Sequence, residues 1–124
     1  MRLFAPLAAL LAPICFALAP TAWAQEGSGV AVAIALDLPQ GGSSRAGLAS
    51  IEPIRTFVRG RPGLVEERLL QGQVDSANDF IHLTVWERLE DWEALFEDQA
   101  FLDLLSATDP QFEPSLAEVY TSIP

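Results

Sequence analysis

The amino-acid sequence predicts an α+β domain of the ferredoxin-like class, with the element order βαββαβ. Segments that alternate between two kinds of side chain are typical of strands, and apolar residues at steps of three and four are typical of amphipathic helices. This order gives an antiparallel sheet with both helices on one face. Strand-like segments lie at 30–38, 64–71, 80–86 and 116–123, and helix-like segments lie at 48–58 and from about 90 to 105.

The N-terminal residues have the layout of a secretory signal peptide. One arginine is followed by an apolar stretch, residues 3–19, and the small residues Ala22 and Ala24 precede the polar Gln25. A basic start, an apolar segment and a small-residue site mark a segment that is removed after export. We therefore expect a signal peptide at 1–24, cleaved after Ala24, and a periplasmic or secreted protein.

The rest of the chain divides into two parts. Residues 25–29 form a polar, glycine-rich leader that we expect to be flexible, and residues 30–124 form the ferredoxin-like domain. A retained membrane anchor and a lipid attached to Cys15 stay open as alternatives to cleavage.

The composition excludes several functions for the exported form. The chain has 17 acidic residues against 7 basic ones, all arginine, and a net charge of −10. A domain this acidic repels phosphate groups, so we expect no nucleic-acid partner and no stable membrane association after cleavage. Cys15 leaves with the signal, so the mature domain has no disulfide, thiolate nucleophile or cysteine metal site. A single histidine is poor provision for zinc, and we expect no metal and no cofactor.

The first half of the domain reads as a strand followed by a helix. Strand 30–38 has bulky residues on one face and alanines on the other. We expect the bulky face to contact the helices and the alanine face to leave room for a cavity. Ser43 or Ser44 can cap the helix. Pro53 is expected to kink or restart it, because proline removes one helical hydrogen bond, and the segment 60–63 ends it.

The second half reads as two strands, one helix and a last strand. Strand 64–71 leads through a turn at 72–79 to strand 80–86. We expect one continuous helix from about Glu90, ended by the segment 108–114, which contains two prolines.

Strand 80–86 carries two different faces. One face is aliphatic, and the other holds Phe80, His82, Thr84 and Trp86. Because both helices cover the same side of the sheet, we expect them to cover the aliphatic face and leave the aromatic face without a helix. Exposed apolar area costs about 25 cal/mol per Å², so we expect a second copy of the chain to cover that face. The prediction is a homodimer that encloses a small cavity beside His82.

Two segments, RPGLVEERLL and DSANDFIHLTVWERLEDWEALFEDQAFLDLL, resemble the antibiotic biosynthesis monooxygenase (ABM)-like family of the dimeric α/β barrel superfamily. The resemblance covers about residues 51–120. It rests on Pro62 and Gly63 before the second strand, Asp79 and Phe80 at the start of the third, Trp86 and Glu87 at its end, the helix from Glu90 to Phe101, and the strand of Tyr120.

The resemblance implies a homodimer whose two sheets close into a barrel. For the oxygenases of the family it implies a phenol or quinol that reacts with O₂ without metal or flavin, in a pocket between sheet and helices. It implies that Trp86 lies in this pocket, that His82 takes the place of a polar pocket residue, often Asn, and that Trp92 takes the place of an aromatic one.

The sequence departs from the family pattern on the second helix. Many members carry a His where this chain has Leu95 and Phe96, and a second His where it has Ala100. The haem-degrading members use the helix His as an iron ligand, so a haem-binding role comes well behind the other functions.

The candidate site residues follow from these patterns. His82 is the only side chain that titrates near neutral pH, and it could act as general base toward a phenolic proton. We expect His82 and Trp86 to be catalytic. Glu67 and Arg68 point to opposite sheet faces, and Arg68 is the better holder of an anionic substrate. The predicted substrate-binding residues are Phe80, Thr84, Trp92, Tyr120 and Arg68.

Two functions stay open from the sequence. One is a cofactor-independent monooxygenase that oxidises a small quinol or phenolic compound with O₂. The other is a non-catalytic periplasmic module of the same fold that binds a small hydrophobic molecule or only dimerises. For each aromatic candidate a packing role is the alternative, and for Arg68 a surface position.

Overall fold

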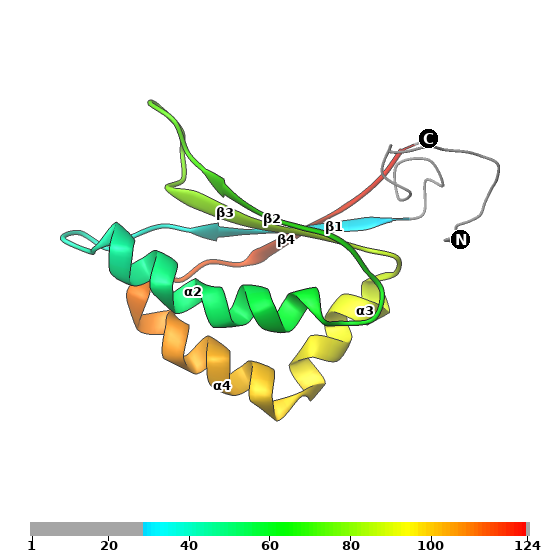
Figure 1. Ribbon diagram of the computed structural model, residues 1–124. Helices are drawn as coiled ribbons and strands as arrows, with labels where there is room; N and C mark the ends of the chain where they lie inside the picture. The colour runs from blue at the N-terminus through cyan, green and yellow to red at the C-terminus, as the bar shows by residue number, and fades with distance from the viewer. Residues whose placement is uncertain (1–28, 124) are drawn as a thin grey trace.

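The computed structural model describes residues 29–123, and it contains one four-stranded antiparallel sheet with helices on one side (Figure 1). The predicted signal peptide and all but the last residue of the predicted leader lie outside the described residues. The elements are β1 (Val30–Leu36), α2 (Ser44–Arg59), β2 (Leu64–Gln71), β3 (Phe80–Trp86), α3 (Leu89–Glu93), the 3₁₀-helix η1 (Ala94–Glu97), α4 (Gln99–Thr108), the 3₁₀-helix η2 (Asp109–Gln111) and β4 (Ala117–Thr121).

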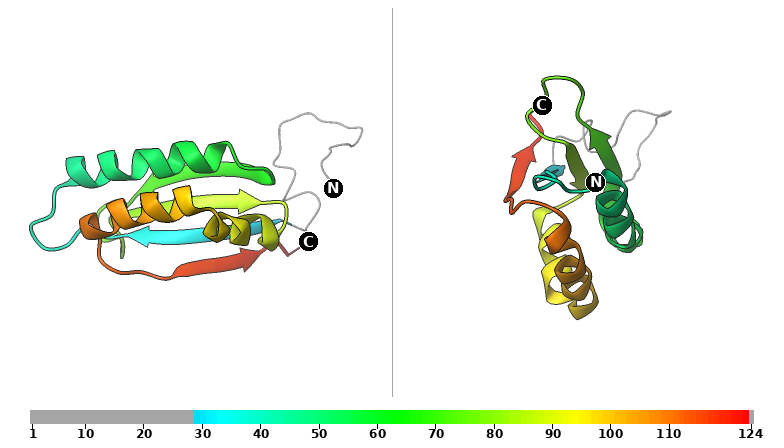
Figure 2. Two further views of the ribbon diagram at one scale, coloured as in Figure 1. Left: turned by 90° about the horizontal axis from the view of Figure 1, so that it is seen from below. Right: turned by 90° about the vertical axis from the view of Figure 1, so that its left-hand side faces the viewer.

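The sheet order is β2-β3-β1-β4, and every neighbouring pair is antiparallel. Figure 2 shows α2 and α4 side by side under the same face of the sheet, with β4 at the edge beyond them. This is the two-layer ferredoxin-like arrangement, so the predicted fold class is confirmed. Among the helices that the structure describes, none is long and apolar enough to span a membrane.

The sequence prediction for the faces of β3 is wrong. In the pairing of β1 with β3, Val32 lies opposite Thr84 and Ile34 lies opposite His82. The bulky face of β1 and the aromatic face of β3 are therefore one face, and the helices cover it. Phe80, His82, Thr84 and Trp86 are all at most 5% exposed within a single chain.

The opposite face of the sheet carries small and aliphatic side chains. In the two central strands it presents Ala31, Ala33, Ala35, Ile81, Leu83 and Val85. No described helix covers this face (Figure 1). The face left without a helix is thus the alanine face, and not the aromatic face of β3. The alanine face also does not form the wall of the cavity described below.

Helix α2 begins and ends where the sequence predicts. The hydroxyl of Ser43 accepts a hydrogen bond from the backbone N–H of Ala46, which caps the first turn. The helix continues through Pro53 without a restart. Pro53 is exposed, so the carbonyl that loses its partner can bond to water.

The second helical region is three short pieces instead of one continuous helix. Asp98 has extended backbone angles, φ −104° and ψ 116°, and separates η1 from α4. Its carboxylate accepts a hydrogen bond from the N–H of Ala100 and caps α4. An aspartate competes for backbone N–H groups in this way, so it starts a new helix where apolar periodicity alone suggests continuity.

We expect Gly63→Ala to destabilise the fold by roughly 2 to 3 kcal/mol. Gly63 has φ +86°, in the left-handed region, and an added Cβ would overlap the side chain of Asp91. Gly41 is the matched control, because its φ is +80° and an added Cβ meets nothing within 4 Å. Gly41→Ala should therefore cost only about 1 kcal/mol. Urea unfolding of both variants measures the difference, and equal losses would contradict the steric argument.

Candidate active site

A cavity of about 510 Å³ lies between the sheet and the helices. Its sheet side is formed by β1, β3 and the start of β4, and its helix side by α2, α3, η1 and α4. The lining is mainly aliphatic and aromatic, and His82 and Thr84 supply polar atoms from the sheet floor. A largely apolar cavity of this volume with a few polar groups has the properties of a small-molecule site.

Aromatic rings form one wall of the cavity. Trp92, Phe96 and Phe101 all line it. The rings of Trp92 and Phe96 lie edge to face with centroids 5.0 Å apart, and those of Phe96 and Phe101 lie 5.4 Å apart at 90°. A wall of rings offers edge and face contacts to a planar aromatic ligand.

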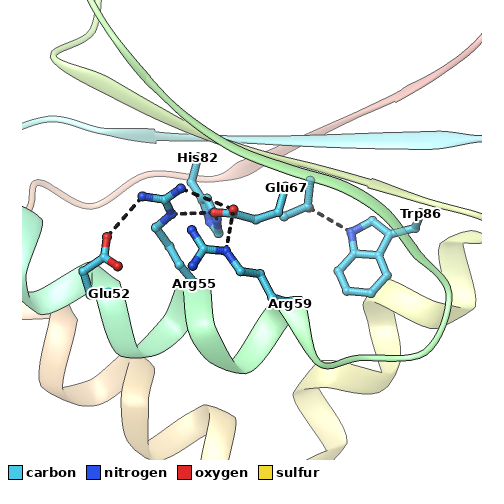
Figure 3. Close-up of polar contacts among 7 residues, drawn as sticks. Glu52, Arg55, Arg59, Glu67, His82 and Trp86 are labelled. Carbon is cyan, nitrogen blue, oxygen red and sulfur yellow. Dashed lines mark hydrogen bonds and ion pairs between the residues drawn. The ribbon is translucent and has the colours of Figure 1, made fainter. Parts of the chain in front are cut away.

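The side chain of His82 is held by a buried carboxylate. Its Nε2 lies 2.9 Å from Oε2 of Glu67 on the neighbouring strand β2. The side chains of His82 and Glu67 are 6% and 4% exposed. Figure 3 shows both residues between the sheet and α2.

Two arginines from α2 hold the same carboxylate. The Nε of Arg55 donates to Oε2 of Glu67 at 2.6 Å, and the Nε of Arg59 donates to Oε1 at 3.1 Å. Arg55 also donates to Glu52 at 3.1 Å. In Figure 3 both guanidinium groups rise from α2 toward Glu67. The arginines are one helical turn apart, so both reach the same acid.

The pKa values of the pair follow from this arrangement. Burial alone would raise the pKa of Glu67, but hydrogen bonds from Arg55, Arg59 and His82 outweigh it and lower the pKa from 4.5 to about 2. Burial lowers the pKa of His82 below its usual 6.5, and the two arginines lower it further against the opposing effect of Glu67. At neutral pH Glu67 is therefore an anion and His82 is neutral.

The charge states fix the tautomer of His82. An ionised carboxylate only accepts hydrogen bonds, so Nε2 of His82 must carry the proton. The other ring nitrogen, Nδ1, then has a free lone pair, and among residues 29–123 it has no hydrogen-bond partner. His82 lines the cavity. It is thus a neutral base oriented by a fixed anion.

Thr84 is the second polar group on the cavity floor. Its Oγ1 accepts a hydrogen bond of 2.8 Å from Nε1 of Trp86. The threonine hydroxyl proton has no acceptor among the described residues, so it can donate to an oxygen atom in the cavity. Trp86 is fully buried and does not line the cavity. Its hydrogen bond instead orients the hydroxyl of Thr84, which does.

The structure brings only part of the predicted site together. Three of the seven predicted residues line the cavity: His82, Thr84 and Trp92. Phe80 and Trp86 are buried in the core. The catalytic role predicted for His82 stays a prediction, with a geometry that suits it.

Two predicted substrate-binding residues lie away from the cavity. Arg68 pairs with Leu83 in the register of β2 and β3, on the face without helices, and its side chain is 60% exposed beside Glu66. Tyr120 lies opposite Ala31 on that same face and donates to Glu118 at 2.8 Å. The face that each strand residue occupies excludes both side chains from this cavity.

Sequence reasoning weighed Glu67 against Arg68 and preferred Arg68, and it missed the two arginines that bind Glu67. A β-bulge between Leu64 and Glu66 shifts the alternation of β2, so Glu67 points toward the helices. The spacing of Arg55 and Arg59 on one helix face was a signal for a shared acidic partner. Among the described residues, no group of three His, Cys, Asp or Glu side chains is placed to hold a metal ion.

We expect the protein to lose stability steadily as the pH falls below 6.5. The folded-state pKa of His82 lies below 6.5, so the unfolded chain takes up that proton first. The folded-state pKa of Glu67 is about 2 against 4.5, so its contribution is present above 4.5 and is lost toward pH 2. Thermal unfolding between pH 7 and pH 3 measures the effect, and an unchanged Tm over that range would contradict it.

Comparison with known proteins finds matches in structure and none in sequence. No protein-family model and no curated protein sequence matches the chain. The crystal structure of SnoaB, a cofactor-independent oxygenase from Streptomyces nogalater, matches with a TM-score of 0.66 at 18% identity, over 78% of this chain and 95% of that one. A protein from Nitrosomonas europaea, provisionally assigned as an antibiotic biosynthesis monooxygenase, matches with a TM-score of 0.67 at 15% identity, over 78% and 92%.

A third match has no assigned activity. It is a dimeric ferredoxin-like protein of unknown function from Thermobifida fusca, with a TM-score of 0.63 at 12% identity, over 77% of this chain and 92% of that one. At these identities the likeness shows the fold. The resemblance to the ABM-like proteins that the sequence indicates is confirmed at that level.

Proposed function

We propose that the protein is a cofactor-independent monooxygenase that oxidises a small phenolic or quinol compound with O₂. The observation that carries the proposal is His82, a buried neutral base that Glu67 orients beside an apolar cavity of about 510 Å³. The fold shared with a cofactor-independent oxygenase supports the same reaction class.

His82 would begin the reaction by taking the phenolic proton on Nδ1. The resulting imidazolium is stabilised by the carboxylate of Glu67 at 2.9 Å. A phenolate gives up an electron more readily than a phenol, so it reduces O₂ to superoxide. The two radicals combine to form a carbon–oxygen bond, and the imidazolium returns its proton to the peroxide.

The second half of the reaction releases water. Loss of the ring C–H proton and of hydroxide, as the O–O bond breaks, leaves a carbonyl group on the ring. One oxygen atom of O₂ enters the product and the other leaves as water. 1-Naphthol would give 1,4-naphthoquinone in this way, with all the electrons supplied by the substrate.

Oxygen uptake tests the proposal. The purified protein is incubated with a panel of naphthols and hydroquinones, without added metal or flavin, and uptake is followed with an oxygen electrode. With ¹⁸O₂, one labelled atom in the naphthoquinone and one in water would support it. Uptake no faster than that of the free compounds in buffer, across the panel, would overturn it.

A binding module without catalysis is the second candidate. The aromatic wall of the cavity supports a binding module as much as it supports an enzyme, because the rings would contact a planar ligand in either case. Trp92 belongs to this wall, so its fluorescence would report a bound ligand. Quenching of tryptophan fluorescence by a naphthol, without oxygen uptake, would identify this function.

We further propose that the protein works as an exported homodimer. The helix-free face of the sheet, with its alanines and aliphatic residues, supports a dimer because exposed apolar area of this kind favours association. The sequence of residues 1–24 supports export. Light scattering and the N-terminal sequence of the mature protein test the two points.

A further inference from the structure

The carboxylates among the described lining residues belong to two exposed residues, so we infer that they lie at the mouth of the cavity. The described lining residues contain no arginine, and their carboxylates are those of Asp109 and Glu113, which are both exposed. Arg55, which is half-buried, and Arg59, which is exposed, are both bound to Glu67 and do not line the cavity. An entering ligand therefore passes acids and meets no fixed positive charge.

The backbone holds both acids at the mouth. Asp109 follows α4 directly, where Thr108 donates to the carbonyl of Ser50 at 3.0 Å. The N–H of Glu113 donates to the carbonyl of Asp37 at 2.7 Å. Among residues 29–123, the arginine ion pairs go to other carboxylates.

The cavity floor points to the kind of ligand. The free lone pair of His82 suits a hydroxyl donor, and the free hydroxyl proton of Thr84 suits an oxygen acceptor. His82 lines the cavity and its side chain is only 6% exposed, so a partner for its open nitrogen would have to come from the cavity. A neutral phenolic O–H satisfies both groups.

We propose that the cavity selects uncharged or cationic aromatic ligands, and that Asp109 and Glu113 reject those that carry a carboxylate or phosphate. This inference rests on the proposed function for the location of the ligand and adds its chemical class. An anion would be repelled at the mouth and would lose its hydration in an apolar cavity without a compensating cation.

Two matched ligands test the proposal. 6-Hydroxy-2-naphthamide and 6-hydroxy-2-naphthoate have nearly the same shape and differ by one charge. Calorimetric titration gives the Kd of each for three proteins: the unchanged chain, the double variant Asp109→Asn/Glu113→Gln, and the control Asp75→Asn/Glu87→Gln. The control removes the same charges from exposed positions that do not line the cavity.

We expect the amide to bind about tenfold or more tightly than the carboxylate to the unchanged chain. The mouth variant should reduce this preference about threefold or more, because two repulsive charges are gone. The control should keep it. Equal Kd values for the two ligands, or an equal reduction in the control, would overturn the proposal.

The same titrations separate this inference from the proposed function. Selective binding of the amide, with no oxygen uptake across the naphthol and hydroquinone panel, would support the charge selection and overturn the oxygenase. Failure of both ligands to bind would overturn the charge selection alone if the panel still shows oxygen uptake, and both proposals if it does not. Oxygen uptake with the carboxylate at the same kcat/KM as with the amide would overturn the charge selection alone.

Discussion

Glu67→Gln is expected to lower the free energy of unfolding by about 3 kcal/mol at pH 7. The variant keeps the shape of the side chain but removes a charge that is 4% exposed and paired with Arg55 at 2.6 Å. It leaves Arg55, 19% exposed, and the N–H of His82 without the anion that they bind. The difference between a pKa of 4.5 and about 2 corresponds to a stabilisation of similar size. Urea unfolding at pH 7 measures the loss.

The neighbouring acid provides the control. Glu66 lies on the helix-free face, is 26% exposed and pairs only loosely with Arg68 at 3.5 Å. Glu66→Gln should therefore cost less than about 1 kcal/mol. If Glu67→Gln costs no more than Glu66→Gln, the buried carboxylate is not what stabilises this layer. The Glu67 variant should also lose the part of the acid sensitivity that falls below pH 4.5.

His82→Gln is expected to reduce kcat for naphthol oxidation by about 10² to 10⁴-fold, the usual contribution of a general base. The glutamine amide can still donate to Glu67, so the fold and the carboxylate keep their partner. It cannot take a proton from the substrate. Oxygen uptake under single-turnover conditions measures the loss, and the Kd of the naphthol should change by less than about tenfold.

Two further measurements separate a base from a packing residue at position 82. Added imidazole should restore part of the activity of His82→Ala, because the free base can enter the space that the side chain leaves. In the unchanged protein the acid limb of kcat/KM should lie below pH 6.5, because the folded-state pKa of His82 is lowered. Full activity in His82→Gln would show that another group, or the solvent, removes the proton.

Much of the fold could be predicted because its signals are local. Alternation in β1 and β3, the serine cap of α2 and the turn segments each depend on residues that are close in sequence. The break at Asp98 was missed because its cap competes with an apolar pattern that continues across it. The side chain of Asp98 therefore sets the start of α4, although the apolar residues around it keep a helical spacing.

The site could be predicted only in part because it depends on register. Alternation tells which residues of β3 share a face, but it does not tell which face the helices cover. That follows from the pairing of Ile34 with His82, which places His82 on the same face as the bulky residues of β1. The bulge after Leu64 then brings Glu67 to the same side. Neither the register of β1 with β3 nor the bulge in β2 can be predicted from the residue pattern of one strand. His82 was therefore identified without its partner, and Arg68 was preferred over the acid beside it.

The cavity has a consequence for how this protein can diverge. Its lining residues in β1 and β3 lie on the helix side of the sheet, and the alanine face lies on the other side. Because the two sets of side chains point to opposite sides of the sheet, a substitution on the alanine face makes no direct change to the sheet side of the cavity. The surface that would pair with a second copy and the floor of the cavity can therefore change in evolution by different substitutions.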